Sequence, residues 1–290
     1  MIASILRKII PARLRPIRYL ENLTRARTGG AVRQGPFIGM RYINRSVGSA
    51  FIPKLLGIYE RELNEYIELS CALQFPLIVD IGAAEGYYAV GMARWNPGAR
   101  VIAFEMEAHG RAALREMAGL NGVEVIEAGS REREAGSGNG RDQRSGQSWE
   151  QKSRVELHGK CDFGNLQATL ASAARSLVIC DVEGYEEILL VPEKIPALAR
   201  ATLLVEMHDC FRPGLTELIA ERFAPTHHAQ RIWAESRAQT DFPFTSIGTR
   251  LMPSRYLDWA VSEWRPTRMS WLWLRPKAAI VGKTRGNVAK

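Results

Sequence analysis

The stretch that decides the fold is Leu77-Ile-Val-Asp80-Ile-Gly82-Ala-Ala-Glu-Gly86-Tyr-Tyr-Ala-Val-Gly91. It joins a short apolar run to a glycine turn and then to a segment that reads as a helix. This order is typical of the first strand, turn and helix of an open parallel sheet. We therefore expect a strand over Leu77–Asp80 and a helix over Glu85–Trp95.

The same alternation continues toward the C-terminus. Further strands are predicted at Arg100–Glu105, Val123–Glu127, Ser176–Cys180, Ala201–Met207 and Ser270–Leu274. Helices are predicted between them at Ala108–Gly119, at Glu186–Leu198, where Pro192 and Pro196 predict a break, and at Gly214–Phe223. Apolar strands that alternate with helices indicate a parallel sheet covered on both faces. The predicted fold is α/β and Rossmann-like, with a mostly parallel seven-stranded sheet.

The chain divides into three predicted parts. Residues 1–35 form a basic N-terminal arm, and residues 36–73 form a helical extension whose main helix covers Lys54–Leu73. Residues 74–290 form the main domain. Within that domain, residues 129–153 are rich in Gly, Ser and charged residues, so we expect a mobile polar insertion there.

Composition and cysteine usage bound the class of protein. The 290 residues are 46% hydrophobic and 24% charged, as in ordinary globular proteins. No apolar run reaches the ~18 residues of a membrane span, and Arg7 and Lys8 interrupt the apolar start, so no signal peptide is expected. The four cysteines are scattered without metal-binding spacing. We expect reduced thiols and a cytoplasmic protein.

The net charge of +8 is concentrated at the N-terminus. The basic residues there are Arg7, Lys8, Arg13, Arg15, Arg18, Arg25, Arg27 and Arg33. Three interpretations remain open: a solvated helix, contact of residues 1–33 with anionic lipid at the inner membrane face, or contact with nucleic acid. Under the membrane interpretation, removal of residues 1–33 should leave folding intact.

The glycine turn predicts the kind of cofactor. Asp80–Gly86 has the form D-x-G-x-A-x-G, which differs from the G-x-G-x-x-G of dinucleotide sites. Gly82 and Gly86 permit a close backbone approach. S-adenosylmethionine carries a sulfonium and an ammonium but no phosphate, which suits a carboxylate at Asp80. Glu105 ends the second strand, where an acidic side chain binds ribose hydroxyls. The alternative is a purely structural turn.

Polar residues follow two more predicted strands. Asp181 and Glu183 follow the fourth strand, and Glu206, His208 and Asp209 lie at the end of the fifth. His208 could act as a general base on an acceptor hydroxyl. Alternatively, Asp181, Glu206 and Asp209 could hold a divalent cation such as Mg²⁺. Helix capping or ion pairing would be the structural alternative.

Four runs resemble the FkbM-type methyltransferases, which belong to the class I S-adenosylmethionine-dependent methyltransferases. They are DIGAAEGYYAVG, AFE, DVEGYEEILL and VEMH, within residues 75–208. The resemblance implies the class I methyltransferase fold and O-methylation of a hydroxyl on a sugar, glycolipid or secondary metabolite. The acceptor would be a small molecule or a glycan.

The resemblance also implies roles for particular residues. Asp80, Gly82 and Gly86 would line the methionine end of the cofactor, and Glu105 would bind the ribose. Asp181 would lie beside both the cofactor's methyl group and the acceptor, together with Glu183. Ala84 and Glu85 would lie at the cofactor edge, although they depart from the common DIGAN-x-G form.

Two other functions remain to be weighed. A nucleic-acid (RNA) methyltransferase is suggested by the pI of about 9.5, but no N/D-P-P-Y/F motif follows the fourth strand, and the acidic DVEG run would repel phosphate. The other alternative is a non-catalytic binding protein with a methyltransferase fold.

Overall fold

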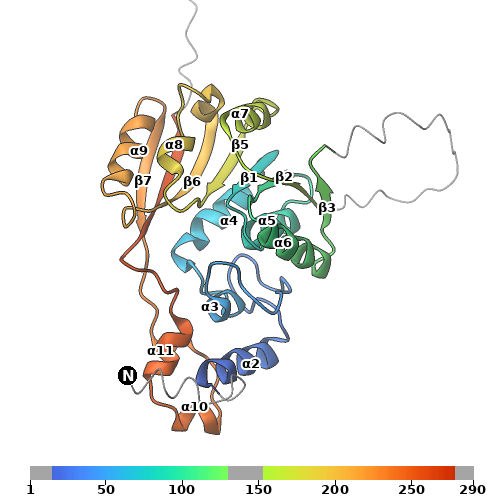
Figure 1. Ribbon diagram of the computed structural model, residues 1–290, viewed down its shortest axis with the longest axis vertical. Helices are drawn as coiled ribbons and strands as arrows, with labels where there is room; N and C mark the ends of the chain where they lie inside the picture. Colours follow the sequence, from blue (N-terminus) through green and yellow to red (C-terminus); the bar gives the residue numbers. More distant parts are fainter. Residues whose placement is uncertain (1–14, 130–152, 278–290) are drawn as a thin grey trace, which may run out of the picture.

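The computed structural model describes residues 15–129 and 153–277, leaving out 1–14, 130–152 and 278–290. An eight-stranded sheet with helices on both faces forms the main body, and a smaller helical lobe extends from one end of it (Figure 1). The middle of the predicted insertion at 129–153 lies outside the described residues.

The sheet has the order β3-β4-β2-β1-β5-β6-β8-β7. Its strands are β1 Leu77–Ile81, β2 Arg100–Phe104, β3 Glu124–Glu127, β4 Arg154–His158, β5 Ser176–Cys180, β6 Ala201–Met207, β7 His227–Trp233 and β8 Ser270–Pro276. Among these strands β8 alone runs opposite to the others, and it pairs antiparallel with both β6 and β7. The strand order reverses at β1, which pairs with β2 on one side and β5 on the other. This confirms the Rossmann-like α/β fold.

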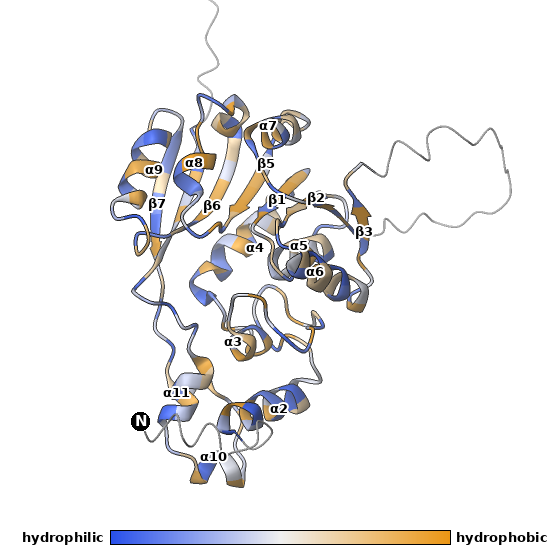
Figure 2. Cartoon of the chain, viewed as in Figure 1, coloured by the Kyte–Doolittle hydropathy of each residue, from blue (hydrophilic) through white to orange (hydrophobic). Residues whose placement is uncertain are grey.

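The prediction of seven strands is wrong, since the sheet has eight. The sequence of β4 and of β7 contains no continuous apolar run, so neither was predicted as a strand. β4 alternates Arg154 and Glu156 with buried Val155 and Leu157, and β7 is mostly polar. By contrast, β1, β5 and β6 are buried along their whole length, which is why their apolar runs were visible in the sequence (Figure 2).

Helices cover the two faces of the sheet through separate apolar clusters. One face packs against α4 Asn64–Ala72, α5 Tyr87–Trp95 and α6 Ala108–Leu120. The other face packs against α7 Phe163–Ala171, α8 Glu186–Leu189 and α9 Leu215–Phe223. The predicted break in the helix at Glu186–Leu198 is confirmed, since α8 ends at Leu189 and a 3-10 turn, η4, covers Pro196–Arg200.

The predicted helix Lys54–Leu73 is also interrupted. It is replaced by α3 Phe51–Leu56, a 3-10 turn at Arg61–Leu63 and α4. Gly57 ends α3 with a positive φ of 70°, a conformation that stops a helix at little cost only for glycine.

The smaller lobe combines residues from both ends of the chain. It consists of α2 Pro16–Thr28, α3, η5 Gln239–Asp241, α10 Ile247–Leu251 and α11 Arg255–Val261. Leu20 of α2 packs with Ile52, Leu56 and residues such as Phe242 and Val261 in one apolar cluster. We call this unit the appended lobe. This packing argues against the prediction that residues 1–33 can be removed without affecting folding, because α2 supplies part of the lobe's core.

Leu20→Ala is expected to destabilise the appended lobe by about 2–5 kcal/mol, since Leu20 is completely buried and truncation leaves a cavity. Hydrogen exchange of α2 and α11 amides would measure the loss. Arg25→Ala, at an exposed position of the same helix, should change stability by about 0.5 kcal/mol or less. Equal effects of the two substitutions would contradict the packing described here.

None of the helices in the described ranges has the length and apolar character that a bilayer crossing requires.

Candidate active site

The carboxyl ends of β1, β2, β5 and β6 open onto one cavity of about 730 Å³. Asp80, Glu105, Asp181 and Glu206 all line it, one from each strand end. The cavity lies at the point where the strand order reverses, which is where open α/β sheets bind ligands. Its volume falls within the usual range of small-molecule sites, about 300–1,000 Å³.

The glycine turn is shaped by packing between strands and helices. Gly82 has a φ of 85°, and a Cβ there would overlap the backbone carbonyl of Asp181, the residue that follows β5. Gly86 also has a φ of 85°, and a Cβ would meet Leu114 of α6 at 2.9 Å. Gly82 and Ala84 line the cavity, whereas Gly86 is not among its lining residues. The predicted cofactor contact at Gly86 therefore gains no support, and this glycine serves the turn.

Glu105 connects the glycine turn to the second strand. Its Oε2 accepts a hydrogen bond from the Ala84 amide at 2.7 Å, and its Oε1 accepts one from the Glu107 amide at 2.7 Å. A carboxylate oxygen has a second lone pair, so Glu105 keeps acceptor capacity toward the cavity. Glu105 can therefore hold the turn and bind a ligand hydroxyl at the same time.

Asp80 has an unsatisfied carboxylate oxygen. The side chain is buried, and its Oδ2 has no hydrogen-bond partner among the described residues. Burial, with the nearby charge of Glu105, raises the pKa of Asp80 to about 7. A buried polar atom without a partner costs free energy, so a donor or cation from a ligand would be favoured there.

Glu85 has a structural place and does not line the cavity. Its carboxylate is fully buried, pairs with Lys54 at 2.5 Å, and accepts hydrogen bonds from the Tyr42 hydroxyl and the Val47 amide. Burial works against ionisation, but the Lys54 charge outweighs it and lowers the pKa of Glu85. The predicted cofactor contact at Glu85 is not supported, since this side chain fastens the N-terminal extension to the glycine turn.

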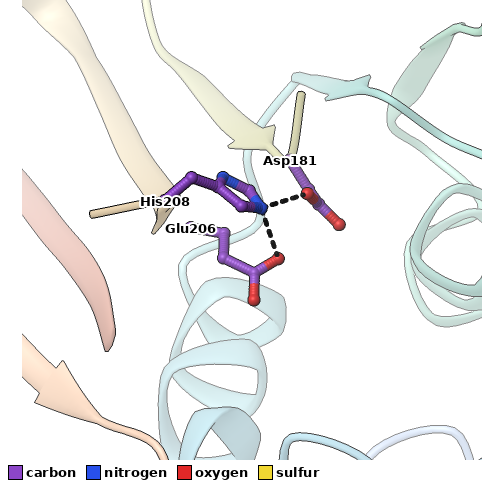
Figure 3. A group of neighbouring side chains, drawn as sticks. All are labelled: Asp181, Glu206 and His208. Atoms are coloured by element: carbon purple, nitrogen blue, oxygen red, sulfur yellow. Dashed lines mark ion pairs between the residues drawn. The ribbon is translucent and has the colours of Figure 1, made fainter. Parts of the chain in front are cut away.

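His208 lies among carboxylates at the end of β6 (Figure 3). Its Nδ1 is 2.8 Å from Glu186 Oε1, and its Nε2 is 3.5 Å from Asp181 Oδ1 and 3.4 Å from Glu183 Oε2. Glu186 therefore orients the ring and leaves Nε2 toward the other two acids. The imidazole also stacks on Phe211. The structure thus brings together the three predicted catalytic residues, Asp181, Glu183 and His208.

Electrostatics at this cluster favour bound protons. Burial disfavours the charged imidazole, but the hydrogen bond and charge of Glu186 outweigh it and raise the pKa of His208. Burial, with the charges of Glu206 and Glu60, raises the pKa of Asp181 well above its ordinary value. His208 and Asp181 therefore both hold their protons more tightly than free side chains do, because the neighbouring groups are acidic.

A buried charge network that the sequence did not predict lies beside His208. Arg265, from the connection between α11 and β8, pairs with Glu206, with Glu60 at 2.5 Å and with Glu263 at 3.0 Å. Burial and the neighbouring acids raise the pKa of Glu60 to about 8, although Arg265 opposes that rise. No local pattern marks the pairs of Arg265 with Glu60 and Glu206, because those partners lie 205 and 59 residues away in the sequence.

The predicted metal ligands are only partly brought together. Ligand atoms of Asp181, Glu206 and His208 lie within 4.8 Å of one another. Asp209 is not in this group: it accepts hydrogen bonds from Thr216 and pairs with Arg231 at 3.3 Å. The structure therefore gives no support to Asp209 as a metal ligand, and His208 lies in the group instead.

The chain matches no protein-family model and no curated protein sequence. Among solved structures, it is similar to a methyltransferase from Geobacter sulfurreducens, with 13% identity over 95% of this chain and 96% of that chain and a TM-score of 0.40. An O-methyltransferase from Bacillus cereus, in complex with S-adenosylhomocysteine, is 13% identical over 73% of this chain and 80% of that chain, with a TM-score of 0.38.

A third solved structure is an O-methyltransferase of tomaymycin synthesis from Streptomyces achromogenes, in complex with S-adenosylmethionine. It is 13% identical over 72% of this chain and 77% of that chain, with a TM-score of 0.38. Likeness at this level concerns the fold alone, so the function is argued from the site.

Proposed function

We propose that this protein is an S-adenosylmethionine-dependent methyltransferase. The observation that carries the proposal is the unpartnered, buried Oδ2 of Asp80, which lies in the same cavity as Glu105 at the reversal of strand order. A cationic ligand with ribose hydroxyls fits this pair of carboxylates, whereas a pyrophosphate would be repelled by them.

The residues around Asp80 and Glu105 in the cavity fit the cofactor. Asp80 would hold a positively charged group of its methionine end, and Glu105 would accept from the ribose hydroxyls. Phe104, Val182 and Leu189 provide apolar lining for the adenine ring. When bound, S-adenosylmethionine supplies an electrophilic methyl group on its sulfonium.

The part of the cavity around His208, which we call the acceptor half, suits an acceptor that carries a hydroxyl. Tyr59, Tyr88 and Trp264 line it with aromatic surface, and His208 Nε2 is available to remove the hydroxyl proton while Glu186 holds Nδ1. The acceptor class that we propose is a sugar, a glycolipid or a secondary metabolite, in line with the resemblance to FkbM-type methyltransferases. The acidic lining disfavours nucleic-acid phosphates, so we do not favour an RNA substrate.

A general base is a better proposal than a Mg²⁺ site for the proton transfer. Glu206, which would have to be a ligand, is already paired with the guanidinium of Arg265. A divalent cation beside that guanidinium would meet electrostatic repulsion at close range.

Calorimetry across pH tests cofactor binding. Because Asp80 must ionise to pair with a cation and its pKa is about 7, affinity for S-adenosylmethionine should be about tenfold higher at pH 8 than at pH 6. Binding should then release a proton near pH 6, which is seen as a dependence of the heat on buffer ionisation. Asp80→Asn should weaken binding and abolish the pH dependence.

Glu187→Gln provides the control, since this carboxylate pairs with Arg212 outside the cavity. It should leave the affinity and its pH dependence unchanged. Absence of S-adenosylmethionine binding by the unmodified protein would overturn the proposed function. The acceptor can then be found by mass spectrometry of lipids and glycans from cells with and without the protein, as the species that lack one methyl group.

A further inference from the structure

Helix α10 and the residues on either side of it, 242–257, lie at the far end of the appended lobe, which we call the tip (Figure 1). The tip presents two apolar side chains to solvent. Ile247 is 80% exposed and Leu251 is 81% exposed, more than any other large hydrophobic side chain in the described ranges. They lie four residues apart on α10, so they project from the same side of the helix. Two such side chains at the end of a lobe can insert together into an apolar environment.

The tip is held firmly in this conformation. Ser246 caps α10 by accepting a hydrogen bond from the Thr249 amide at 3.0 Å, and its hydroxyl is 2.8 Å from that of Tyr19 on α2. Gly248 lies against Tyr19 so closely that a Cβ would approach the phenol oxygen to 2.5 Å. The exposure of Ile247 and Leu251 is therefore a property of a packed structure.

The charge around this apolar pair is positive. Residues 242–257 contain Arg250 and Arg255 and no acidic residue; of the acids on either side, Asp241 pairs with Arg61 and Asp258 accepts a hydrogen bond from the Gln239 amide. The neighbouring α2 carries exposed Arg18, Arg25 and Arg27, and its one acidic residue, Glu21, pairs with Arg18. The tip thus has the opposite charge to the acidic cavity.

We propose that α10 and the adjoining face of α2 dock on an anionic lipid surface, with Ile247 and Leu251 inserted among the acyl chains. Apolar side chains flanked by arginines bind such interfaces because burial and attraction to anionic headgroups act together. A second copy of this chain fits less well, since a twofold contact through the tip would place arginines against arginines.

The tip is connected directly to the cavity. Helix α11 begins at Arg255 in the tip, and the residues that follow it, Glu263 to Arg265, line the cavity wall. Docking would therefore bring the acceptor half of the cavity toward a lipid-borne hydroxyl. This link to a glycolipid acceptor rests on the proposed function, whereas docking itself can be tested without turnover.

Sedimentation of the full chain with vesicles tests the docking. Vesicles of phosphatidylcholine with phosphatidylglycerol should bind the protein, and vesicles of phosphatidylcholine alone should bind it weakly. Ile247→Ser combined with Leu251→Ser should lower binding by about tenfold or more. Arg250→Gln combined with Arg255→Gln should lower it most at low salt.

Leu120→Ser is the matched control, since Leu120 is a 42% exposed apolar residue of α6 in the main body. It should bind vesicles like the unmodified chain, and all variants should keep the same affinity for S-adenosylmethionine if they are folded. Binding that survives the double serine substitution would place the contact elsewhere and overturn the proposal. A dimer of the unmodified chain that the double substitution dissociates would also overturn it, because the tip would then bind a second copy.

Discussion

His208→Ala is expected to lower methyl transfer by about 10²–10⁴-fold, the usual contribution of a general base. The affinity for S-adenosylmethionine should change by about twofold or less, because Asp80 and Glu105 lie at other strand ends. His208 Nε2 is the one imidazole nitrogen of this residue that Glu186 does not occupy. Initial rates with the identified acceptor, together with calorimetry of cofactor binding, would measure the two effects.

The pH dependence gives a second readout of the same residue. Since Glu186 raises the pKa of His208 despite burial, the imidazole becomes a free base only above the ordinary histidine pKa of 6.5. The rate should therefore rise with pH through a value above 6.5, and EDTA should have no effect. Full activity of His208→Ala, or activity lost with EDTA and restored by Mg²⁺, would contradict the general-base assignment.

Arg265→Met is expected to destabilise the protein by about 3–5 kcal/mol at neutral pH, because it leaves the buried carboxylates of Glu60 and Glu206 without their cation, whereas Glu263 keeps its pair with Arg237. Glu60, Glu206 and Glu263 are each nearly inaccessible to solvent and converge on this guanidinium. Urea unfolding would measure the loss. Arg212→Met removes a surface pair with Glu187 and should change stability far less, because solvent screens that pair.

The loss should also depend on pH. The pKa of Glu60 is already raised to about 8, and removal of Arg265 would raise it further. An acid whose pKa is higher in the folded state loses stability as pH rises from its unfolded pKa toward the folded one. The free energy of unfolding of Arg265→Met should therefore be closer to that of the unmodified protein at pH 5.5 than at pH 8.5. A loss that does not vary with pH would contradict a network of unpaired carboxylates.

The sequence by itself determined the strand, turn and helix at β1 and the edge of the sheet where the acidic residues lie. An apolar run, a glycine turn and a helix are local signals, because burial of a strand and a positive φ at Gly82 each restrict the residues allowed at that position. Once the strands are parallel, the carboxyl ends of β1, β2, β5 and β6 must lie at one edge. Asp80, Glu105, Asp181 and His208 could be placed together for that reason.

Only the tertiary structure decided which of these carboxylates are free to act. The sequence predicts a cofactor contact at Glu85, but in the structure Lys54 pairs with this carboxylate. The sequence predicts a metal ligand at Asp209, but in the structure Arg231 pairs with it. Arg265 reaches Glu60 across 205 residues, and Tyr19 contacts Ser246 across 227. Such pairs leave no periodic trace in the sequence, because one charged or hydroxyl side chain is enough to make each contact, and its partner is selected by the folded topology.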